Sequence, residues 1–397
     1  MMKKAFIFIG FATLIAYSHA QSAQRPAARE KVPVDSIFRT PVYLQEPSPT
    51  SMTVMWLTHV PSHSWVEYGT DTLNMKRAHT LVEGIIMANN TINRIVLRNL
   101  EPGTRYYYRV YSREVTLYMP YRKEFGDTAI SPLSYFTTWD DAQTDFTAVI
   151  FNDLHDRYPV LDRLSEHLQD IPYDVVFFNG DCISDAQTEA AAVRSIAEFS
   201  RRTRSDRVPS IYVRGNHEAR GAYSLHLWDL LGLMDGRPFG AFNLGDTRFV
   251  LLDAGEDKPD DSREYFGMND FSCFREEQAE FLKRELASKT FQSAARKVLI
   301  HHIPAYGWRE EDGRFSPALL SWGDILATAQ FDIALNAHTH RYDYHPKGTR
   351  HGNNYPVMVG GGNNEQTATV AILRKQGDRL TLTVLNAEGE TLLMEEL

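Results

Sequence analysis

Two patterns of apolar and polar positions divide the chain. Between residues 41 and 138, short segments of alternating apolar and polar residues are separated by turn-forming residues, as in half-buried β-strands. The predicted strands are 51–57, 64–68, 94–97, 105–111 and 133–138. Because no helical period interrupts them, this block is predicted to form a small all-β sandwich.

After residue 140 the pattern changes to alternating strands and helices. Apolar runs predict strands at 146–151, 174–178, 210–213, 249–252, 298–300 and 333–335. Helical spacing of apolar residues predicts helices at 160–171, 188–203 and 276–288. Two final strands, 380–385 and 391–394, have no helix between them. We therefore expect a layered α/β domain with a mixed sheet at residues 145–397.

The first twenty residues have the pattern of an export signal. Lys3 and Lys4 precede an apolar run at 5–17, and Ser18 and Ala20 complete an A-x-A-like cleavage pattern. The run is short for a membrane-spanning helix, and an uncleaved anchor is the alternative interpretation. We expect a signal peptide at 1–20, a linker at 21–40, and a secreted or periplasmic mature protein without a transmembrane segment.

Composition restricts the class of partner. The 397 residues are 43% hydrophobic and 23% charged, which is typical of a globular protein large enough to fold without disulfides. Loss of the two signal-peptide lysines changes the net charge from −9 to −11, so general nucleic-acid binding is not expected. Cys182 and Cys273 are predicted to be free or buried thiols. The sequence carries no signal of an oligomeric state.

Five polar clusters lie where predicted strands of the α/β block end. They are Asp153-Leu154-His155, Asn179-Gly180-Asp181, Gly215-Asn216-His217-Glu218, His301-His302-Ile303-Pro304 and His338-Thr339-His340. Sites in α/β sheets form at the carboxyl ends of strands, so we expect these clusters to share one pocket. The mixture of histidine and carboxylate suits Zn, Mn or Fe, whereas Ca and Mg prefer oxygen ligands alone.

Two bound divalent ions would give this pocket the charge that a phosphate group requires. Asp153 and Asp181 would neutralise two of the four positive charges, which leaves about two for a phosphate dianion. Ions about 3.5–4 Å apart can clamp phosphate oxygens and generate a bridging hydroxide that attacks phosphorus. His217, beside Asn216, is placed to protonate the leaving alkoxide. The residues therefore predict hydrolysis of a small phosphorylated substrate.

The ordered motifs D-x-H, G-D, G-N-H-E, H-x-P and H-x-H resemble those of the calcineurin-like metallophosphoesterase superfamily, from Asp153 to His340. This resemblance implies a four-layer α/β/β/α sandwich. It implies two divalent or mixed-valence metal ions, Fe, Mn or Zn, with ligands assigned as follows. The first ion is held by Asp153, His155 and His340, Asp181 bridges, and the second ion is held by Asn216, His302 and His338.

The same resemblance implies that His217 is the acid or a phosphate ligand. The predicted substrate-binding residues are Asn216, His217 and Arg220. Arg214 and Arg220 flank the third motif, and an ordinary surface position is an equal alternative for both. His302 is preferred to His301 as the ligand because the family's ligand lies two residues before the proline. His301 is expected to be a packing residue.

The front block, residues 41–138, resembles the fibronectin-III-like N-terminal domain of purple acid phosphatases. The matching segments are 53–56, 66–69, 100–104, 106–108 and 136–138. One departure matters: Ser184 stands where those enzymes carry the tyrosine that ligates ferric iron, and His155 takes its place. We therefore expect no purple Fe(III) centre. Ala337 replaces a usual glycine without changing a ligand.

Other interpretations stay open. A secreted binding protein that kept a phosphatase fold would need ligand losses, and all seven ligands are present. The N-terminal domain could bind glycans or proteins, or only support the fold. Tyr306 and Trp308 could stack on a leaving group or pack in the core. The acidic loop 253–261 could be a lid, but a solvated connection is the favoured interpretation.

Overall fold

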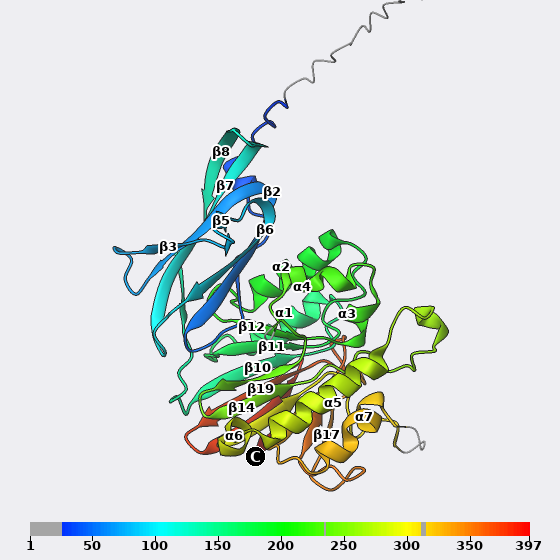
Figure 1. Cartoon of the computed structure of the whole chain (residues 1–397). Coiled ribbons are helices and arrows are strands. Elements are labelled where there is room, and N and C mark those ends of the chain that lie inside the picture. The colour runs from blue at the N-terminus through cyan, green and yellow to red at the C-terminus, as the bar shows by residue number, and fades with distance from the viewer. Residues whose placement is uncertain (1–25, 234–235, 311–314) are drawn as a thin grey trace, which may run out of the picture.

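The computed structural model describes residues 26–233, 236–310 and 315–397. They form an all-β N-terminal part and a larger α/β part, joined by residues 138–145 (Figure 1). The signal peptide predicted at 1–20 lies outside the described residues. Within these ranges, no helix has both the length and the apolar character needed to cross a membrane. Cys182 is buried, Cys273 is exposed, and both are free thiols.

The N-terminal part is a seven-stranded sheet built around one long strand, β2. The first half of β2 pairs with β1 and β6, and its second half pairs with β3 and β7. Its strands are β1 (Tyr43–Gln45), β2 (Ser51–Gly69), β3 (Lys76–Ala78), β6 (Ala88–Arg98), β7 (Arg105–Met119), β8 (Arg122–Ile130) and β9 (Ser134–Thr137). A separate hairpin joins β4 (Leu81–Val82) to β5 (Ile85–Ile86), and a 3-10 helix, η1 (Val34–Ser36), precedes β1.

The long strand corrects one prediction. The segments 51–57 and 64–68, predicted as two strands, are parts of β2, which shifts register against β6 between Leu57 and Ser62 and continues. Its alternation gives Met52, Val54 and Trp56 to the core of this part. The strands therefore form one continuous sheet around that core, and the prediction of an all-β block is confirmed. A fibronectin-III-like topology stays a prediction.

The first sheet of the α/β part has the order β12-β11-β10-β19-β20-β21. Its strands are β10 (Phe146–Phe151), β11 (Val175–Asn179), β12 (Ser210–Val213), β19 (Thr369–Gln376), β20 (Arg379–Asn386) and β21 (Thr391–Glu396). The first three are parallel and entirely buried, because both faces of the sheet are covered. Helices α1 (Tyr158–Glu166) and α2 (Glu189–Arg202) cover the outer face. Helix α2 begins after Thr188, whose hydroxyl accepts the N–H of Ala191.

The second sheet has the order β13-β14-β15-β16-β18-β17. Its strands are β13 (Gly240–Leu244), β14 (Thr247–Leu251), β15 (Arg296–Ile300), β16 (Ile333–Asn336), β17 (Asp343–His345) and β18 (Val357–Val359). Its outer face is covered by α5 (Phe271–Ala287) and α7 (Pro317–Leu326). The short helices are α3 (Asn216–Arg220), η2 (Ser224–His226), α4 (Leu227–Leu230), η3 (Arg263–Tyr265) and α6 (Lys289–Ser293).

The two sheets pack face to face, which confirms the predicted four-layer α/β/β/α fold. Side chains from both sheets, including Phe146, Phe177, Phe249 and Leu335, form the apolar layer between them. Each sheet then buries its other face under its helices. Strands β10, β11, β12, β15 and β16 each end at one of the five polar clusters or within two residues of it.

The N-terminal part is packed against the α/β part by the opposite face of β2. Met55 and Leu57 alternate with Val54 and Trp56 along the strand, so they point away from the N-terminal core. They are completely buried in the apolar cluster that lies over α1 and α2. Tyr43, also completely buried there, donates its hydroxyl to the carbonyl of Leu230 at 2.8 Å.

Candidate metal centre

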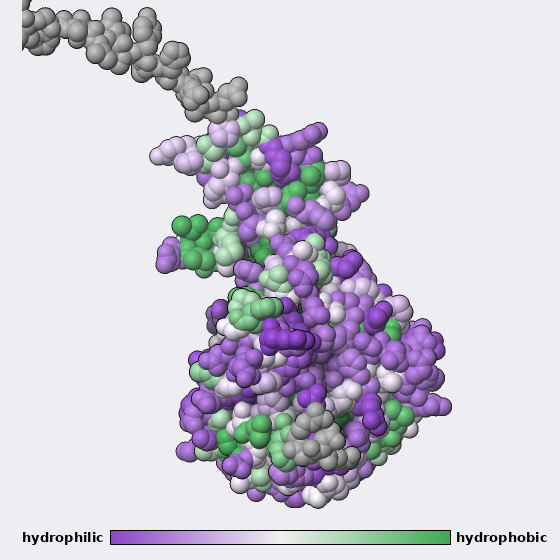
Figure 2. Space-filling view, turned by 90° about the vertical axis from the view of Figure 1, so that its right-hand side faces the viewer, coloured by the Kyte–Doolittle hydropathy of each residue, from purple (hydrophilic) through white to green (hydrophobic). Residues whose placement is uncertain are grey.

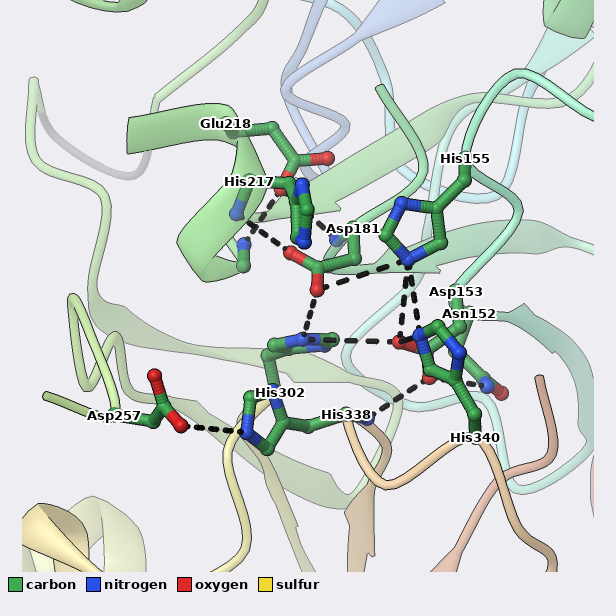
Figure 3. Close-up of polar contacts among 12 residues, drawn as sticks. Asn152, Asp153, His155, Asp181, His217, Glu218, Asp257, His302, His338 and His340 are labelled. Atoms are coloured by element: carbon green, nitrogen blue, oxygen red, sulfur yellow. Dashed lines mark hydrogen bonds and ion pairs between the residues drawn. The ribbon is translucent and has the colours of Figure 1, made fainter. Parts of the chain in front are cut away.

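The five polar clusters converge at one edge of the two sheets. In Figure 3 the labelled side chains from these loops face one another around a common space. Asp153 and His155 follow β10, Asp181 follows β11, Asn216 and His217 begin α3, His302 follows β15, and His338 and His340 follow β16. Six of the seven predicted metal ligands, far apart in the sequence, therefore lie together, and the seventh, Asn216, is the neighbour of His217, which is grouped with His155 and Asp181.

One group of ligand atoms comes from Asp153, His155 and His340, whose atoms lie within 4.8 Å of one another. Oδ1 of Asp153 is 3.4 Å from Nε2 of His340, and the two Nε2 atoms of His155 and His340 are 3.0 Å apart. A carboxylate and two imidazoles at this separation form a suitable set for a transition-metal ion. These residues are the three predicted for the first metal.

A second group comes from Asp181, His302 and His338, again within 4.8 Å. Oδ2 of Asp181 lies 3.1 Å from Nε2 of His302 and 3.9 Å from Nε2 of His155. The same carboxylate oxygen therefore faces both groups. This position suits the bridging role predicted for Asp181.

Unpartnered buried atoms support a cation in this space. Oδ1 of Asp153, Oδ1 of Asn216 and Nδ1 of His338 are buried without a hydrogen-bond partner. Buried polar atoms are normally paired, because an unpaired one costs about 1–3 kcal/mol. A carboxylate oxygen, an amide oxygen and an imidazole nitrogen are all metal ligands, so the donor set fits a pair of divalent ions.

The backbone of the ligand loops is strained. Asp153, His155, Asp181, His338 and His340 all have positive φ, between 44° and 75°. Residues other than glycine seldom adopt this conformation, and where they do the cost is of order 1–3 kcal/mol each. Strain concentrated at the proposed ligands indicates a functional constraint on these loops.

Glycines are required where the loops approach one another most closely. A Cβ atom at Gly180 would lie 2.3 Å from the ring of His302, and one at Gly215 would lie 2.3 Å from Oδ1 of Asp181. Gly180 also has positive φ. The glycines of the G-D and G-N-H-E motifs therefore permit the close packing of the ligands.

Hydrogen bonds behind the ligands fix their orientation. Nδ1 of His302 donates to the carbonyl of Asn179 at 2.9 Å, which leaves Nε2 free to bind a metal. Nδ2 of Asn152 donates to Oδ2 of Asp153 at 3.0 Å, and the N–H of His338 donates to the same oxygen at 2.8 Å. The other oxygen, Oδ1, is thereby directed into the site.

The carboxylates attract positive charge to this space. Burial alone would lower the pKa of His302, but Asp181 and Asp153 outweigh it and raise that pKa to about 10. In turn, although burial opposes ionisation of Asp181, the facing His302 holds its pKa well below the usual range. For His155 burial dominates and lowers the pKa to about 4. A metal ion would replace the proton on His302, because ligation requires the neutral ring.

His217 lies beside the ligand groups and is contacted at both ring nitrogens. Its Nδ1 is 3.1 Å from Oδ2 of Asp185, and its Nε2 is 3.1 Å from Nη1 of Arg220. Its ring centroid is 4.6 Å from that of His155. Arg220 therefore faces the site, whereas Arg214 pairs with the buried Asp253 at 2.7 Å. Asp185 was not predicted, although it lies only four residues after Asp181.

The prediction that the acidic loop 253–261 is a solvated connection was wrong for the first residues of the loop. Asp253 and Glu256 are completely buried, and Glu256 accepts two hydrogen bonds from Arg220 at 2.8 and 2.9 Å. The side chain of Asp257 is 10% exposed, and its Oδ2 is 3.7 Å from Nε2 of His338. The first part of the loop therefore reaches the site, where its carboxylates face basic side chains. The acidic sequence of the loop did not reveal these contacts.

The remaining candidate residues separate into packing and rim positions. His301 is buried, donates Nδ1 to the carbonyl of Ile303 at 2.8 Å and contacts the ring of Trp322, as a packing residue would. Tyr306 is buried against Tyr355 in the core. Trp308 instead packs edge-on against His338, with ring centroids 4.8 Å apart, at the rim of the site.

Glu218 and the amide groups around it complete the third motif. Its carboxylate is buried and accepts the N–H groups of Asp181, Ile183 and Gly215, each at 2.9 Å. It therefore joins the G-D loop to the G-N-H-E loop. Glu218 was recognised in the sequence as part of the G-N-H-E motif. Its role in connecting two loops is visible only in the fold.

Comparison with known proteins assigns the two parts separately. The family model of calcineurin-like phosphoesterases matches residues 146–342, and that of the purple acid phosphatase N-terminal domain matches residues 39–138. Human acid phosphatase type 7 is 29% identical over 194 residues, and the mouse protein is 28% identical over 192. Each alignment covers 46% of this chain but only 41% and 40% of the respective relative.

Solved structures share the fold across most of the chain. Purple acid phosphatase PPD1 from yellow lupin (Lupinus luteus) superposes with a TM-score of 0.66 at 16% identity, covering 89% of this chain and 73% of its own. PhoD superposes with a TM-score of 0.63 at 13% identity, covering 89% and 88%. Since the two family models match adjacent parts of one chain, its α/β part carries a calcineurin-like phosphoesterase domain and its N-terminal part a purple acid phosphatase N-terminal domain.

Proposed function

We propose that this protein is an exported dinuclear-metal phosphoesterase that hydrolyses phosphomonoesters, with phosphodiesters as the next class. The observation that carries the proposal is the convergence of six of the proposed ligand side chains, together with buried, unpartnered ligand atoms that include Oδ1 of Asn216. We place the calcineurin-like domain at 145–397 and the N-terminal domain at 41–138. The signal peptide predicted from the sequence at 1–20 supports a secreted or periplasmic location.

The metal ligands would be divided between two positions. Asp153, His155 and His340 would hold one ion, Asn216, His302 and His338 the other, with Asp181 between them. When bound, the two ions clamp phosphate oxygens and lower the pKa of a water molecule. The metals would be Fe, Mn or Zn, because the donors combine carboxylate and imidazole. Ser184 supplies no phenolate, so a coloured tyrosinate–iron centre is not proposed.

His217, Asn216 and Arg220 would act on the substrate. In the structure the Nε2 atom of His217 accepts a hydrogen bond from Arg220. Arg220 is itself anchored by two hydrogen bonds to the buried Glu256. We propose that a phosphate oxygen enters between these two side chains and replaces their contact. Arg220 then neutralises phosphate charge, while Nε2 of His217 faces the leaving oxygen and donates a proton to it.

Metal analysis combined with an ester screen tests this proposal. The mature chain is loaded with Mn, Zn or Fe, its metal content is measured, and turnover of chromogenic phosphomonoesters and phosphodiesters is recorded. We expect about two ions per chain and faster turnover of the monoester. Full metal content without turnover of any ester would instead favour the alternative, a secreted binding protein that kept the fold.

Substitution of His217 tests its role separately from metal binding. His217→Ala is expected to lower kcat by about 10²–10⁴-fold, the usual contribution of a general acid, with metal content unchanged. His226→Ala is the matched control, because His226 is an exposed histidine outside the site. Equal kcat values for the two variants would remove the acid role from His217.

A further inference from the structure

A second cleft lies at the junction of the N-terminal and α/β parts, with a volume of about 450 Å³. Its walls come from the start of β7, from β9 and the following segment, and from the loops that precede β11 and β12. Three arginines line it: Arg105, Arg204 and Arg207. Tyr135 and Tyr173 also line it. Both parts of the chain therefore contribute cationic and aromatic groups to one cleft.

The guanidinium groups are held in place by aromatic rings. The guanidinium carbons of Arg105 and Arg207 lie 4.7 and 5.2 Å from the ring centroid of Tyr135. That of Arg204 lies 5.0 Å from the ring centroid of Tyr173. Such contacts restrict the long side chains yet leave N–H groups in the guanidinium plane free to donate. The arrangement is thus partly organised for an acceptor-rich ligand.

Positive charge in the cleft exceeds its compensation. In the part of the chain that the structure describes, Arg105 and Arg204 form no ion pair, and Arg204 donates only to the carbonyls of Leu168 and Gln169. Arg207 is 3.5 Å from the carboxylate of its neighbour Asp206. Asp174 also lines the cleft, where one of its oxygens accepts the N–H of Thr147 at 2.8 Å. The three arginines therefore face two carboxylates and keep one surplus positive charge.

The cleft is separate from the metal centre. Asp174 and Pro209 immediately precede β11 and β12, whereas Asp181 and Asn216 follow the same strands. Strand β11 has five residues, and at ~3.3 Å per residue it spans roughly 16 Å. The cleft therefore lies at the opposite edge of the first sheet, out of reach of the metal ligands.

We propose that this cleft binds the phosphate group of a small molecule, either inorganic phosphate or a phosphorylated organic compound. Arginine is suited to phosphate because its planar donors pair with two oxygens at once, and the surplus positive charge of the cleft attracts an anion. The volume exceeds that of a phosphate ion, and the tyrosine walls can contact an organic group. Because the ligand touches both parts, its binding also stabilises their docking.

Counting bound phosphate tests the proposal on the metal-loaded full chain. Equilibrium dialysis with labelled inorganic phosphate is compared for the native protein and Arg105→Ala/Arg204→Ala/Arg207→Ala. Three exposed arginines outside the cleft give the matched control, Arg98→Ala/Arg194→Ala/Arg284→Ala. We expect the cleft variant to bind one phosphate fewer than the native and control proteins, with unchanged kcat for ester hydrolysis. Equal phosphate binding by all three proteins would overturn the proposal.

Two further measurements make the outcome specific. Phenylphosphonate, which carries a ring and resists hydrolysis, is titrated in parallel. If it binds the cleft more tightly than phosphate does, the ligand is a phosphorylated organic compound. If its binding is equal or weaker, the ligand is free phosphate. Arg207→Gln alone, at a half-exposed side chain, is expected to weaken cleft binding at least threefold without unfolding. The difference in bound phosphate between the cleft variant and the control depends on the cleft arginines alone, so it stands even where ester hydrolysis fails.

Discussion

At the scale of single residues, His217 is held by an acidic and a basic side chain at opposite ring nitrogens. Arg220 can only donate, so its contact makes Nε2 of His217 an acceptor and places the ring proton on Nδ1, facing Asp185. When Nε2 is protonated for catalysis, Nδ1 still donates to Asp185. The carboxylate therefore orients the ring in both protonation states, as a positioning residue.

Removal of Asp185 is expected to reduce kcat without affecting metal binding. Asp185→Ala should lower kcat about 10- to 100-fold, part of the effect of a general acid, because the ring loses its fixed orientation. Asp185→Asn keeps an acceptor and should lose less. Steady-state kinetics and metal content of both variants are compared with Asp170→Ala, an exposed aspartate outside the site. Equal kcat for Asp185→Ala and Asp170→Ala would contradict the positioning role.

Sequence reasoning identified side chains that the fold brings together, but it did not identify the residues that support them. Asp153, Asp181 and His302 were predictable because each lies in a motif directly after a buried strand. Asp185 and Asp257 could not be assigned in this way, because their partners are far along the chain and only the packed loops bring them together. An isolated aspartate in a loop gives no signal of such a contact.

At the scale of elements, the loop between β14 and α5 contacts both the proposed substrate-binding side and the proposed metal-binding side of the site. Glu256 anchors Arg220, and the next residue, Asp257, faces His338. Nδ1 of His338 is buried and unpartnered, so Asp257 contacts the nitrogen that does not face the proposed metal. A carboxylate at that nitrogen orients a ligating histidine and increases its basicity.

Asp257→Asn is therefore expected to weaken metal binding at the position of His338, Asn216 and His302. Loss of a partner of this kind typically costs about 10- to 100-fold in metal affinity. Metal content after dialysis against graded concentrations of a chelator measures the effect. Asp261→Asn, at an exposed position of the same loop, is the control. If both variants retained two ions equally, Asp257 would have no role in orienting His338.

Elements were predicted well where burial made their sequence uniform. The strands β10, β11 and β12 are buried on both faces, so each appeared as an apolar run. The extent of β2 was missed, because the polar residues around Pro61 look like a turn although the strand only bends there. Helix α7 was missed although Leu319, Trp322 and Leu326 have helical spacing and Ser316 caps its start.

At the scale of the whole molecule, the two parts share an apolar cluster but not the site. Every proposed ligand and substrate-binding residue lies between Asp153 and His340, in the α/β part. The N-terminal part instead inserts Tyr43, Met55 and Leu57 among the residues that cover α1 and α2. The composition of a strand does not reveal which of its two buried faces meets another domain, so this docking could not be predicted from sequence.

Weakening that contact should uncouple unfolding of the two parts while leaving the chemistry intact. Met55→Ala and Leu57→Ala each remove a completely buried side chain, with an expected loss of about 2–5 kcal/mol per site. In calorimetry we expect one transition for the native protein and two for the double variant, with metal content and kcat unchanged. Val54→Ala, on the opposite face of β2, removes apolar volume from the N-terminal core and should destabilise that part without weakening the docked face. A double variant that lost its metal ions would show instead that the N-terminal part maintains the geometry of the site.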